Sequence, residues 1–325
     1  FFWSFSEKLI IYLIGTTFLT HHICIWMDTM DKRDKRKKRV FQLGILLLLG
    51  TILCLKYRNF FFGNVSKLAM VLHIDWSYQD QLIFLPIGIS FYTLSAIGYM
   101  ADVYWGKVKA EYSLVKTALF LGFFPVIVEG PICRWEDVED TLFKNESVKA
   151  ENVFKGCYRI IWGLFKKMII ADRLAVLVDK VYVGYESYSG AVIVAAAISY
   201  TIQLYMEFSG CMDMVIGSAG LFGIRLPENF SQPFFAKTCT DFWKRWHITL
   251  GVWFKNYIFY PVSISKTARK WNKFTRKHFK GDFGKYVARM GIAAMALFPV
   301  WISNGLWHGP KWNYIFYGLY YFGLI

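Results

Sequence analysis

Residues 9–27 read LIIYLIGTTFLTHHICIWM, and residues 27–40 continue as MDTMDKRDKRKKRV. The first stretch meets the requirement for a membrane-spanning helix, which is roughly 20 predominantly apolar residues. The second stretch carries seven Lys and Arg side chains between Lys32 and Arg39. Because Lys and Arg concentrate on the cytoplasmic side of membrane proteins, the two stretches predict a membrane helix followed by a cytoplasmic basic loop at residues 28–39.

The same alternation of apolar stretches and basic connections continues along the chain. A second basic segment, residues 263–289, carries nine Lys and Arg side chains and predicts another cytoplasmic loop. Further spans are predicted at residues 40–55, 82–100, 114–128, 191–206, 287–301 and 312–325. We therefore expect an all-α integral membrane protein with at least seven spans in a single domain, residues 1–325. The chain starts at Phe1 and stops inside an apolar run, so we expect it to be truncated at both ends.

The composition excludes several other classes of protein. Of the 325 residues, 55% are hydrophobic and 19% are charged, and the formal net charge of +15 is spread between apolar stretches. This distribution excludes a soluble nucleic-acid-binding protein, and the continuous apolar runs exclude a β-barrel, whose strands alternate. The six cysteines are widely spaced and form no C-x-x-C pair, so we expect reduced thiols and no metal site.

Two segments are apolar but interrupted by charges. Residues 157–173 place basic side chains at spacings that give a helix with a one-sided basic face. Residues 234–261 are rich in Trp, Phe and Tyr yet also hold Lys, Arg, Asp and His. Because charged groups at membrane depth must face protein or water, we expect interfacial or re-entrant segments here.

His308 is the strongest candidate for a catalytic residue. It lies in SNGLWHGPKW, residues 303–312, between two glycines and directly after an apolar stretch. Imidazole is the side chain whose ordinary pKa allows proton transfer near neutral pH, and glycine lets a backbone or a substrate approach closely. The alternative is a histidine that packs at a helix end without a chemical role, and position alone leaves both interpretations open.

His247 belongs to a second polar group, in TDFWKRWHITLGVWFKNYIFYP, residues 240–261. In a continuous helix, four polar side chains of this stretch would approach one face and line a wet region. These four are Asp241, Arg245, His247 and Asn256. The alternative is an aromatic belt, because Trp and Tyr favour the depth of the lipid headgroups and Lys and Arg reach toward water there.

Glu207 and Asp213 interrupt an otherwise apolar, glycine-bearing run. Carboxylates at membrane depth are costly unless paired, so we expect structural ion pairs rather than catalysis. Their expected partners are Arg225, Arg245 or Lys237. The two acids lie six residues apart and would face different sides of a helix, which argues against a paired-carboxylate acid–base mechanism.

Signatures of P-loop, α/β-hydrolase and zinc-protease enzymes are missing from the sequence. A histidine without a serine or cysteine nucleophile beside it suggests direct transfer. In such a reaction the histidine deprotonates an acceptor hydroxyl, which attacks an activated acyl group whose leaving thiol has a low pKa.

Seven motifs in the last three quarters of the chain, about residues 80–325, resemble those of the membrane-bound O-acyltransferase family. They are LPIGISFYTLSAIGYMADVYWG, GPICR, GLFKKMIIADRL, EFSGCMDMVIG, LPENFSQPF, DFWKRWHITLGVWFKNYIFYP and GLWHG, in this order. Within the family they are most similar to the bacterial branch that carries out alginate O-acetylation and, as a near relative, teichoic-acid D-alanyl transfer. Residues 211 and 212 depart from the family, because Cys211 and Met212 replace its usual Tyr and Ser, and no polar contact is carried over to them.

The resemblance implies a multi-helix bundle around a central pore, with re-entrant or interfacial helices. His308 matches the family histidine that lies midway across the membrane, and it is expected to act as general base. His247 matches the second family histidine and is expected to support it or position the donor. Weaker candidates for lining the pore and binding substrate, chosen because they adjoin these histidines, are Asn304, Trp307, Arg245 and Trp246.

The resemblance also implies the substrates and the surroundings. The donor is expected to be a thioester, acetyl-CoA or an acyl carrier protein, with no bound cofactor and no metal. The acceptor is a hydroxyl of an extracytoplasmic cell-envelope polysaccharide, reached through an extracytoplasmic SGNH-type acyltransferase partner. The expected location is the bacterial cytoplasmic (inner) membrane, crossed several times and surrounded by lipid. The two basic segments suit an anionic donor, although the charge rule for membrane topology also accounts for them.

Three alternatives stay open. One is D-alanyl transfer from a carrier protein to teichoic acid. Another is a proton-coupled or ion-coupled transporter, in which His308, His247 and the two carboxylates Glu207 and Asp213 form a path through the bundle. The last is a membrane scaffold in which the histidines only pack.

Overall fold

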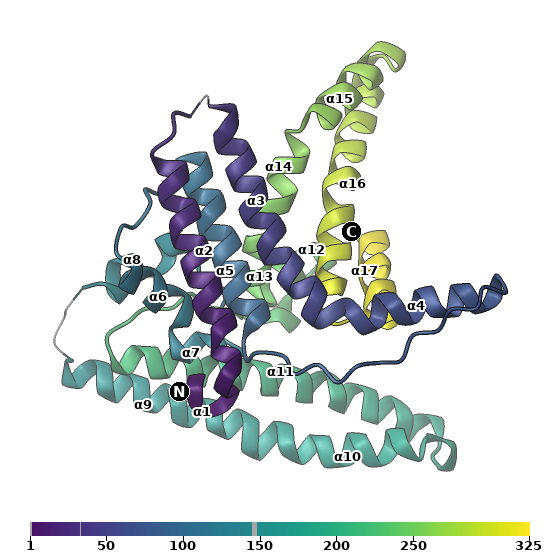
Figure 1. Ribbon diagram of the computed structural model, residues 1–325. Coiled ribbons are helices and arrows are strands. Elements are labelled where there is room, and N and C mark those ends of the chain that lie inside the picture. Colours follow the sequence, from purple (N-terminus) through teal and green to yellow (C-terminus); the bar gives the residue numbers. More distant parts are fainter. Residues whose placement is uncertain (1, 33, 145–147) are drawn as a thin grey trace.

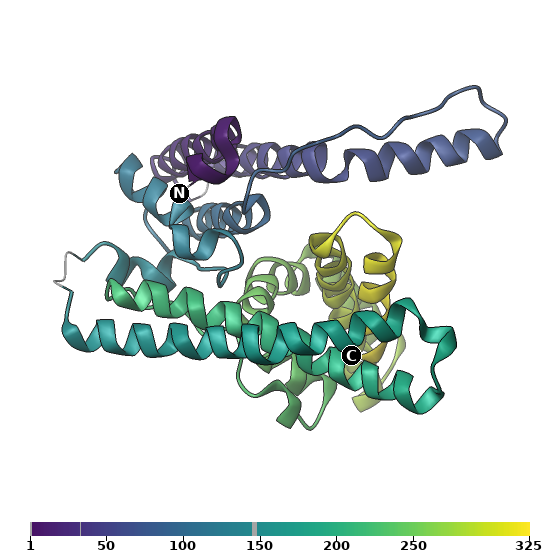
Figure 2. The ribbon, with the colours of Figure 1, turned by 90° about the horizontal axis from the view of Figure 1, so that it is seen from below.

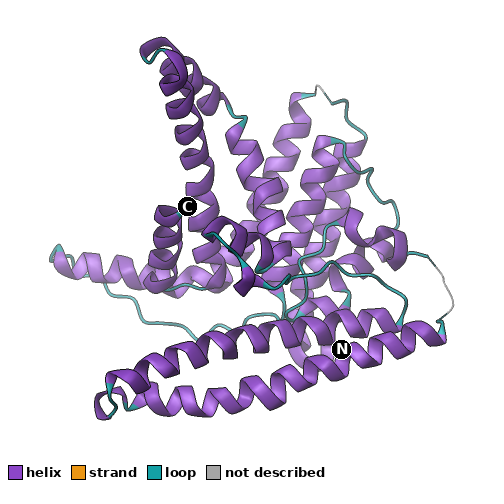
Figure 3. Ribbon diagram, turned by 180° about the vertical axis from the view of Figure 1, so that it is seen from behind, coloured by secondary structure: helices purple, strands orange, loops and turns teal. Residues whose placement is uncertain are grey.

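The computed structural model describes residues 2–32, 34–144 and 148–325, which form helices joined by turns and extended connections (Figure 3). No strand occurs in these ranges, and their paired extended backbone is limited to one antiparallel bridge between Phe230 and Trp246. The expectation of an all-α fold is confirmed.

The N-terminal helices are α1 (Phe2–Ser6), α2 (Ile10–Asp28), α3 (Lys35–Ile52), α4 (Arg58–Val71) and α5 (Ile89–Trp105). Helices α2, α3 and α5 stand side by side in Figure 1 and bury apolar side chains such as Met27, Leu48 and Met100 between them. A π-helical turn, Leu53–Tyr57, joins α3 to α4, which extends sideways from the bundle. This turn contacts the C-terminal half of the chain, because Lys56 and Tyr57 bind backbone carbonyls of α16.

Three short helices, α6 (Leu114–Gly122), α7 (Phe124–Ile127) and α8 (Trp135–Leu142), lead to a long antiparallel arm. The arm consists of α9 (Ala150–Leu164), a π-helical turn (Phe165–Ala171), α10 (Asp172–Val183) and α11 (Gly190–Leu221), which returns alongside both. Figure 1 shows the arm crossing the lower end of the N-terminal helices, and Figure 2 shows it from below, running past the C-terminal helices. The arm therefore underlies both halves of the molecule.

The C-terminal helices are α12 (Cys239–Arg245), α13 (Ile248–Phe254), α14 (Tyr260–Ser263), α15 (Lys266–His278), α16 (Gly281–His308) and α17 (Trp312–Leu324). A π-helical turn, Lys255–Phe259, connects α13 to α14. Helix α17 folds back against α16 at two glycines: a Cβ at Gly305 would lie 2.2 Å from the Tyr314 carbonyl oxygen, and one at Gly318 would lie 2.3 Å from the Trp301 carbonyl oxygen. These glycines allow the last two helices to pack at backbone contact.

Four helical stretches are long and apolar enough to cross a membrane, by length and composition: Phe2–Asp28, Lys35–Val71, Gly190–Leu221 and Gly281–His308. The chain is therefore a membrane protein, but the predicted minimum of seven spans is not reached in the described residues. The predicted span at 312–325 corresponds to α17, which has only 13 residues, and the predicted spans at 82–100 and 114–128 are wrong in extent. Helix α5 begins only at Ile89, after Pro86 and Gly88, and the helix from Leu114 breaks at Phe123, ahead of Pro125.

Both basic segments lie at the same end of the molecule, the upper end in Figure 1. The predicted loop at 263–289 is nevertheless largely helical, which corrects its description as a loop, whereas the predicted loop at 28–39 includes the connection between α2, which ends at Asp28, and α3, which begins at Lys35. Asp34 caps α3 by accepting a hydrogen bond from the Arg36 N–H at 2.8 Å, and Ser265 caps α15 by accepting one from the Ala268 N–H at 3.2 Å. Arg33, part of the first segment, lies outside the described residues. The placement of the two basic segments in the cytoplasm stays a prediction.

Candidate active site

His308 is the last residue of α16, His247 lies directly before α13, and both imidazole rings contact the ring of Trp307. The centroid of the Trp307 ring lies 5.6 Å from that of His247 and 5.1 Å from that of His308, edge to face in both cases. Asn304 lies one turn before Trp307 on α16 and is buried. We call His247, Asn304, Trp307 and His308 the histidine site.

The backbone places His247 at a break between two helices. Helix α12 ends at Arg245, and His247 has φ 48° and ψ 51°, a left-handed conformation that few residues other than glycine adopt. Hydrogen bonds on either side hold this break: the Ser231 N–H donates to the Arg245 carbonyl and the Ile248 N–H donates to the Asn229 carbonyl, both at 2.9 Å. The prediction of one continuous helical stripe through His247 is therefore wrong.

The imidazole of His247 is buried, with only 5% of the residue exposed. Its Nδ1 lies 3.2 Å from the Asn229 Oδ1, and its Nε2 has no hydrogen-bond partner among the described residues. Phe208 of α11 packs edge-on against the ring, with centroids 4.9 Å apart. The Nδ1 of His247 thus contacts Asn229, while its Nε2 is buried without a partner in the described residues.

Helix α16 presents its last turns to this region. The Asn304 Oδ1 and the Trp307 Nε1 are buried, and neither has a hydrogen-bond partner in the ranges described. The backbone end of the helix is held from the N-terminal half: the Lys56 Nζ donates to the Trp307 carbonyl at 2.6 Å, and the Tyr57 hydroxyl donates to the Leu306 carbonyl. A cation at a helix C-terminus is favourable, because the unpaired carbonyls there carry partial negative charge.

His308 itself is exposed and sits beside aromatic rings of α17. The Tyr314 ring stacks on it with centroids 5.9 Å apart, and the Tyr317 ring meets it edge-on at 5.7 Å. A Cβ at Gly309 would come within 2.7 Å of the Tyr314 ring. Gly309 thus allows the Tyr314 ring to pack closely against the end of α16.

Arg245 and Trp246 make contacts of a different kind. The Arg245 Nε donates to the Asp241 Oδ1 at 3.1 Å, and this guanidinium holds the pKa of the Asp241 carboxyl below its usual value. The Trp246 ring packs in an aromatic cluster, stacked on Phe242 at 5.6 Å and edge-on to Phe230 at 5.1 Å. Both residues adjoin His247 in sequence, and their part in binding substrate stays a prediction.

Glu207 and Asp213 form ion pairs with the basic face of the arm. The Asp213 carboxylate contacts the Lys166 Nζ at 2.7 Å and the Arg159 Nε at 3.1 Å, and the Glu207 carboxylate contacts the Lys167 Nζ at 2.7 Å. The expectation that these acids form ion pairs is confirmed. Their predicted partners are wrong, because α9 and the turn after it, and not residues 225, 237 or 245, lie alongside α11.

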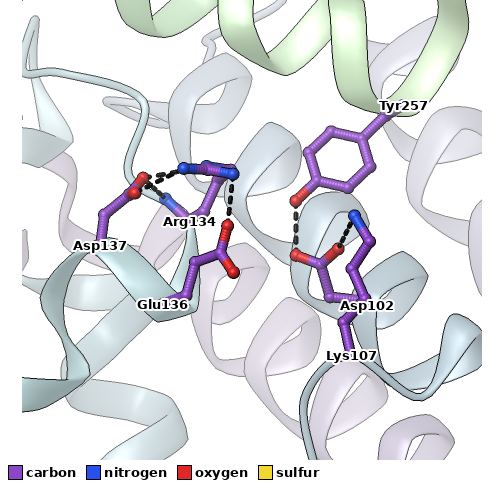
Figure 4. Close-up of polar contacts among 6 residues, drawn as sticks. All are labelled: Asp102, Lys107, Arg134, Glu136, Asp137 and Tyr257. Carbon is purple, nitrogen blue, oxygen red and sulfur yellow. Dashed lines mark hydrogen bonds and ion pairs between the residues drawn. The ribbon is translucent and has the colours of Figure 1, made fainter. Parts of the chain in front are cut away.

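A second polar cluster joins three of the sequence motifs (Figure 4). The Tyr257 hydroxyl donates to the Asp102 carboxylate at 2.5 Å, and the Lys107 Nζ approaches the same carboxylate at 3.4 Å. Beside them the Arg134 guanidinium binds Asp137 at 2.7 Å and also contacts Glu136. Asp102 lies about 16 Å along α5 from Phe91, whose ring touches Trp307. Since its charges are paired, this cluster holds α5 against the π-helical turn Lys255–Phe259 rather than offering a binding site.

Three residues that contact this site were not predicted from the sequence: Asn229, Lys56 and Tyr57. Asn229 lies within the motif LPENFSQPF and is fully buried, so a polar residue in that motif was the available signal. Lys56 follows an apolar run, and its contact with α16 spans more than 250 positions of sequence, so no local pattern indicates it. The described residues contain no group of three or more His, Cys, Asp or Glu side chains that could hold a metal ion.

The histidine site is thus suited to proton transfer. It offers an accessible imidazole, a buried imidazole with a free nitrogen, an indole N–H and an amide, all close to one another. A neutral imidazole can take a proton from a hydroxyl, and buried polar groups without protein partners can orient a substrate by hydrogen bonds.

Comparison with known proteins gives a consistent picture. Residues 107–277 match the model of the membrane-bound O-acyltransferase family, a range that includes His247 and ends before His308. The chain is 32% identical over 94% of its length to a probable alginate O-acetylase AlgI of Pseudomonas putida, of which it covers 58%. It is 29% identical over 98% of its length to a peptidoglycan O-acetyltransferase of Helicobacter pylori, covering 60%, and 29% identical over 72% of its length to a teichoic acid D-alanyltransferase of Bacillus subtilis, covering 56%. The chain therefore spans a little over half the length of these relatives.

Proposed function

Because the chain belongs to the membrane-bound O-acyltransferase family, we propose that it moves an acetyl group from a cytoplasmic thioester across the bilayer to hydroxyls of an extracytoplasmic cell-envelope polysaccharide. The names of two relatives, an alginate O-acetylase and a peptidoglycan O-acetyltransferase, support this acceptor class. The observation that carries the proposal is the histidine site, where two imidazoles meet at Trp307 beside buried polar atoms that lack protein partners within the described ranges.

His308 is the general base in this proposal. An unprotonated nitrogen of its imidazole removes the proton of the acceptor hydroxyl, and the hydroxyl oxygen attacks the carbonyl carbon of the thioester. The carbon–sulfur bond then breaks, the ester forms, and the departing thiolate takes up the proton that the imidazole carried. The exposure of His308 supports this assignment, since a substrate can reach it, whereas the burial of His247 suits a supporting role.

The donor in this proposal is acetyl-CoA or an acyl carrier thioester. Both are anionic, and the presence of both basic segments at one end of the molecule supports a donor that approaches from that end. The remaining parts of the proposal follow the family: residence in the bacterial cytoplasmic membrane, and an extracytoplasmic SGNH-type acyltransferase that receives the acetyl group and supplies a serine nucleophile.

D-alanyl transfer from a carrier protein to teichoic acid is the second candidate, because two relatives carry that name. The transporter alternative needs Glu207 and Asp213 beside the histidines in a proton path. Their ion pairs with Lys167, Lys166 and Arg159 argue against it, since these partners already hold both carboxylates.

Transfer of labelled acetyl groups tests the proposal. The full-length protein in membrane vesicles receives labelled acetyl-CoA together with its own cell-envelope fraction, and wild type is compared with His308→Ala and His247→Ala at matched levels of folded protein. Loss of a general base lowers transfer by about 100-fold or more, so we expect His308→Ala to be essentially inactive. His278→Ala is the matched control, because His278 lies on exposed α15 and, in the described ranges, contacts the carbonyl and the ring of Phe274 on its own helix.

The outcomes separate the candidates. If acetyl-CoA gives no transfer but an aminoacyl carrier protein does, the D-alanyl function replaces the acetyl function. If neither donor is used and the histidine variants behave like wild type, the acyltransferase proposal is wrong, and the transporter and scaffold alternatives return.

A further inference from the structure

Asn229 is a fully buried side chain that contacts the histidine site from behind. It lies in the connection between α11 and α12, and its amide oxygen Oδ1 faces three groups. The Thr249 N–H approaches it at 3.1 Å, the Thr249 Oγ1 at 2.9 Å and the His247 Nδ1 at 3.2 Å. On the other side of the amide, the Nδ2 lies 3.1 Å from the Met212 sulfur. All four of these residues are buried.

These contacts determine which way the amide points. A backbone N–H can only donate, so the Asn229 atom that faces the Thr249 N–H must be the oxygen. The opposite orientation would set the amide nitrogen against that N–H, two donors facing each other. The Thr249 hydroxyl accepts from the Ile132 N–H at 3.0 Å, which directs its own proton to the Asn229 oxygen.

The same contacts determine where His247 carries its hydrogen. The Asn229 oxygen can only accept, so the His247 nitrogen that faces it, Nδ1, carries the hydrogen and donates. In a neutral imidazole the other nitrogen, Nε2, then has a free lone pair. This Nε2 is buried and has no partner in the described part of the chain, while the indole N–H of Trp307 beside it is likewise without one.

We propose that Asn229 is a positioning residue that holds His247 as its Nδ1–H tautomer, so that Nε2 accepts a hydrogen bond from an O–H or N–H group of a bound substrate. The proposal rests on the proposed function only for the identity of that substrate. A buried acceptor that the protein does not satisfy is costly unless something else satisfies it.

Nitrogen NMR tests the tautomer without reference to activity. The full-length protein is labelled with ¹⁵N-histidine and reconstituted in lipid nanodiscs, and the His247 signals are assigned by their loss in His247→Gln. We expect a protonated Nδ1 and an unprotonated Nε2 in wild type. A proton on Nε2 in wild type, alone or together with one on Nδ1, would overturn the proposal without need of any variant at Asn229.

Two substitutions at Asn229 test its role. Asn229→Asp keeps an acceptor oxygen of nearly the same shape, and Asn229→Leu removes it. We expect Asn229→Asp to keep the hydrogen on Nδ1 and Asn229→Leu to shift it toward Nε2, with labelled-acetyl transfer falling at least tenfold in the Leu variant and only a few-fold in the Asp variant. An unchanged tautomer in folded Asn229→Leu, or an equal loss of transfer in both variants, contradicts the positioning role.

The two readouts separate this inference from the proposed function. If wild type shows the Nδ1–H tautomer and Asn229→Leu loses it, the inference stands even where acetyl-CoA is not the donor. If Asn229→Leu does not fold, the wild-type spectrum and the Asn229→Asp spectrum still decide the matter, since each predicts a hydrogen on Nδ1.

Discussion

The arm and the histidine site both bury polar groups among apolar helices, but the groups differ in their partners. In the arm, the Asp213 carboxylate, whose side chain is 13% exposed, is held by Lys166 at 2.7 Å and Arg159 at 3.1 Å. At the histidine site, the Nε2 of His247, the Oδ1 of Asn304 and the Nε1 of Trp307 are buried without a partner in the described ranges.

The backbones of the arm also pack closely against each other. Helices α9 and α11 touch at two pairs of glycines: a Cβ at Gly163 would lie 2.5 Å from the Gly210 carbonyl oxygen, and one at Gly156 would lie 2.8 Å from the Gly217 carbonyl oxygen. This closeness leaves no room for another molecule between the two helices at these points. Paired charges and closely packed backbones therefore stabilise the arm, although Gln203 Oε1 and Ser209 Oγ of α11 are also buried without a partner in the described ranges. At the histidine site such atoms gather around the two imidazoles, which supports a ligand there.

The largest effect is expected from filling the glycine contact of the arm. Gly163→Leu would force a side chain against the Gly210 carbonyl, so α9 and α11 must separate. Overpacking of this kind costs about 3 kcal/mol, and the loss of neighbouring contacts adds to it. We expect a large drop in the thermal unfolding temperature of the detergent-purified protein and a low yield of monodisperse material.

Gly50→Leu is the matched control for that change. Gly50 also lies within a helix, α3, but a Cβ there meets nothing within 4 Å. We expect its melting temperature to stay at or above that of wild type, because glycine is a poor helix former. Equal destabilisation by both substitutions would show that the glycine contact does not seal the arm.

A smaller effect is expected from unpairing the arm's charges. Asp213→Asn removes the carboxylate and leaves the ammonium of Lys166 and the guanidinium of Arg159 facing a neutral amide. Leaving partly buried charges without their partner costs about 1–3 kcal/mol, so unfolding should occur at lower temperature or denaturant concentration. Glu228→Gln is the control, since Glu228 binds the same Arg159 but its side chain is 57% exposed. If both substitutions destabilise equally, burial is not what makes the Asp213 pair matter.

Much of the fold could be predicted from local patterns in the sequence. Apolar runs of sufficient length predicted helices, and charge counts predicted two basic segments that do lie at one end of the molecule. The motif resemblance singled out His308 and His247, and the structure does bring them to the same tryptophan. These features were predictable because each depends on residues close together in sequence or on a motif that recurs in a family.

Features that depend on long-range packing were not predictable. The partners of Glu207 and Asp213 follow from the antiparallel register of α9 and α11, which glycine contacts set and no charge pattern reveals. The break at His247 depends on pairing with Asn229–Ser231, so helical spacing alone gave a continuous stripe in its place. Hydropathy likewise predicted one span at 114–128. In the structure the backbone breaks at Phe123, ahead of Pro125, and two short helices, α6 and α7, take its place.

The smallest structural effect, paired with a measurable loss of function, is expected at the histidine site. Trp307→Phe removes an indole N–H that has no partner among the described residues and keeps an aromatic ring against His247 and Phe91. Because no protein hydrogen bond is lost, the melting temperature should stay close to that of wild type. One hydrogen bond to a substrate is worth about 1.4 kcal/mol, so labelled-acetyl transfer should fall about tenfold.

This combination is the converse of the one expected for Asp213→Asn, which lowers stability through a contact within the protein. Trp162→Phe supplies the control for the change of ring, because Trp162 is 48% exposed on α9, away from the histidine site. It should alter neither quantity. If Trp307→Phe instead destabilises the protein as much as Asp213→Asn while transfer per folded molecule is unchanged, then the buried indole N–H serves the fold, and the contrast between arm and site does not locate a ligand.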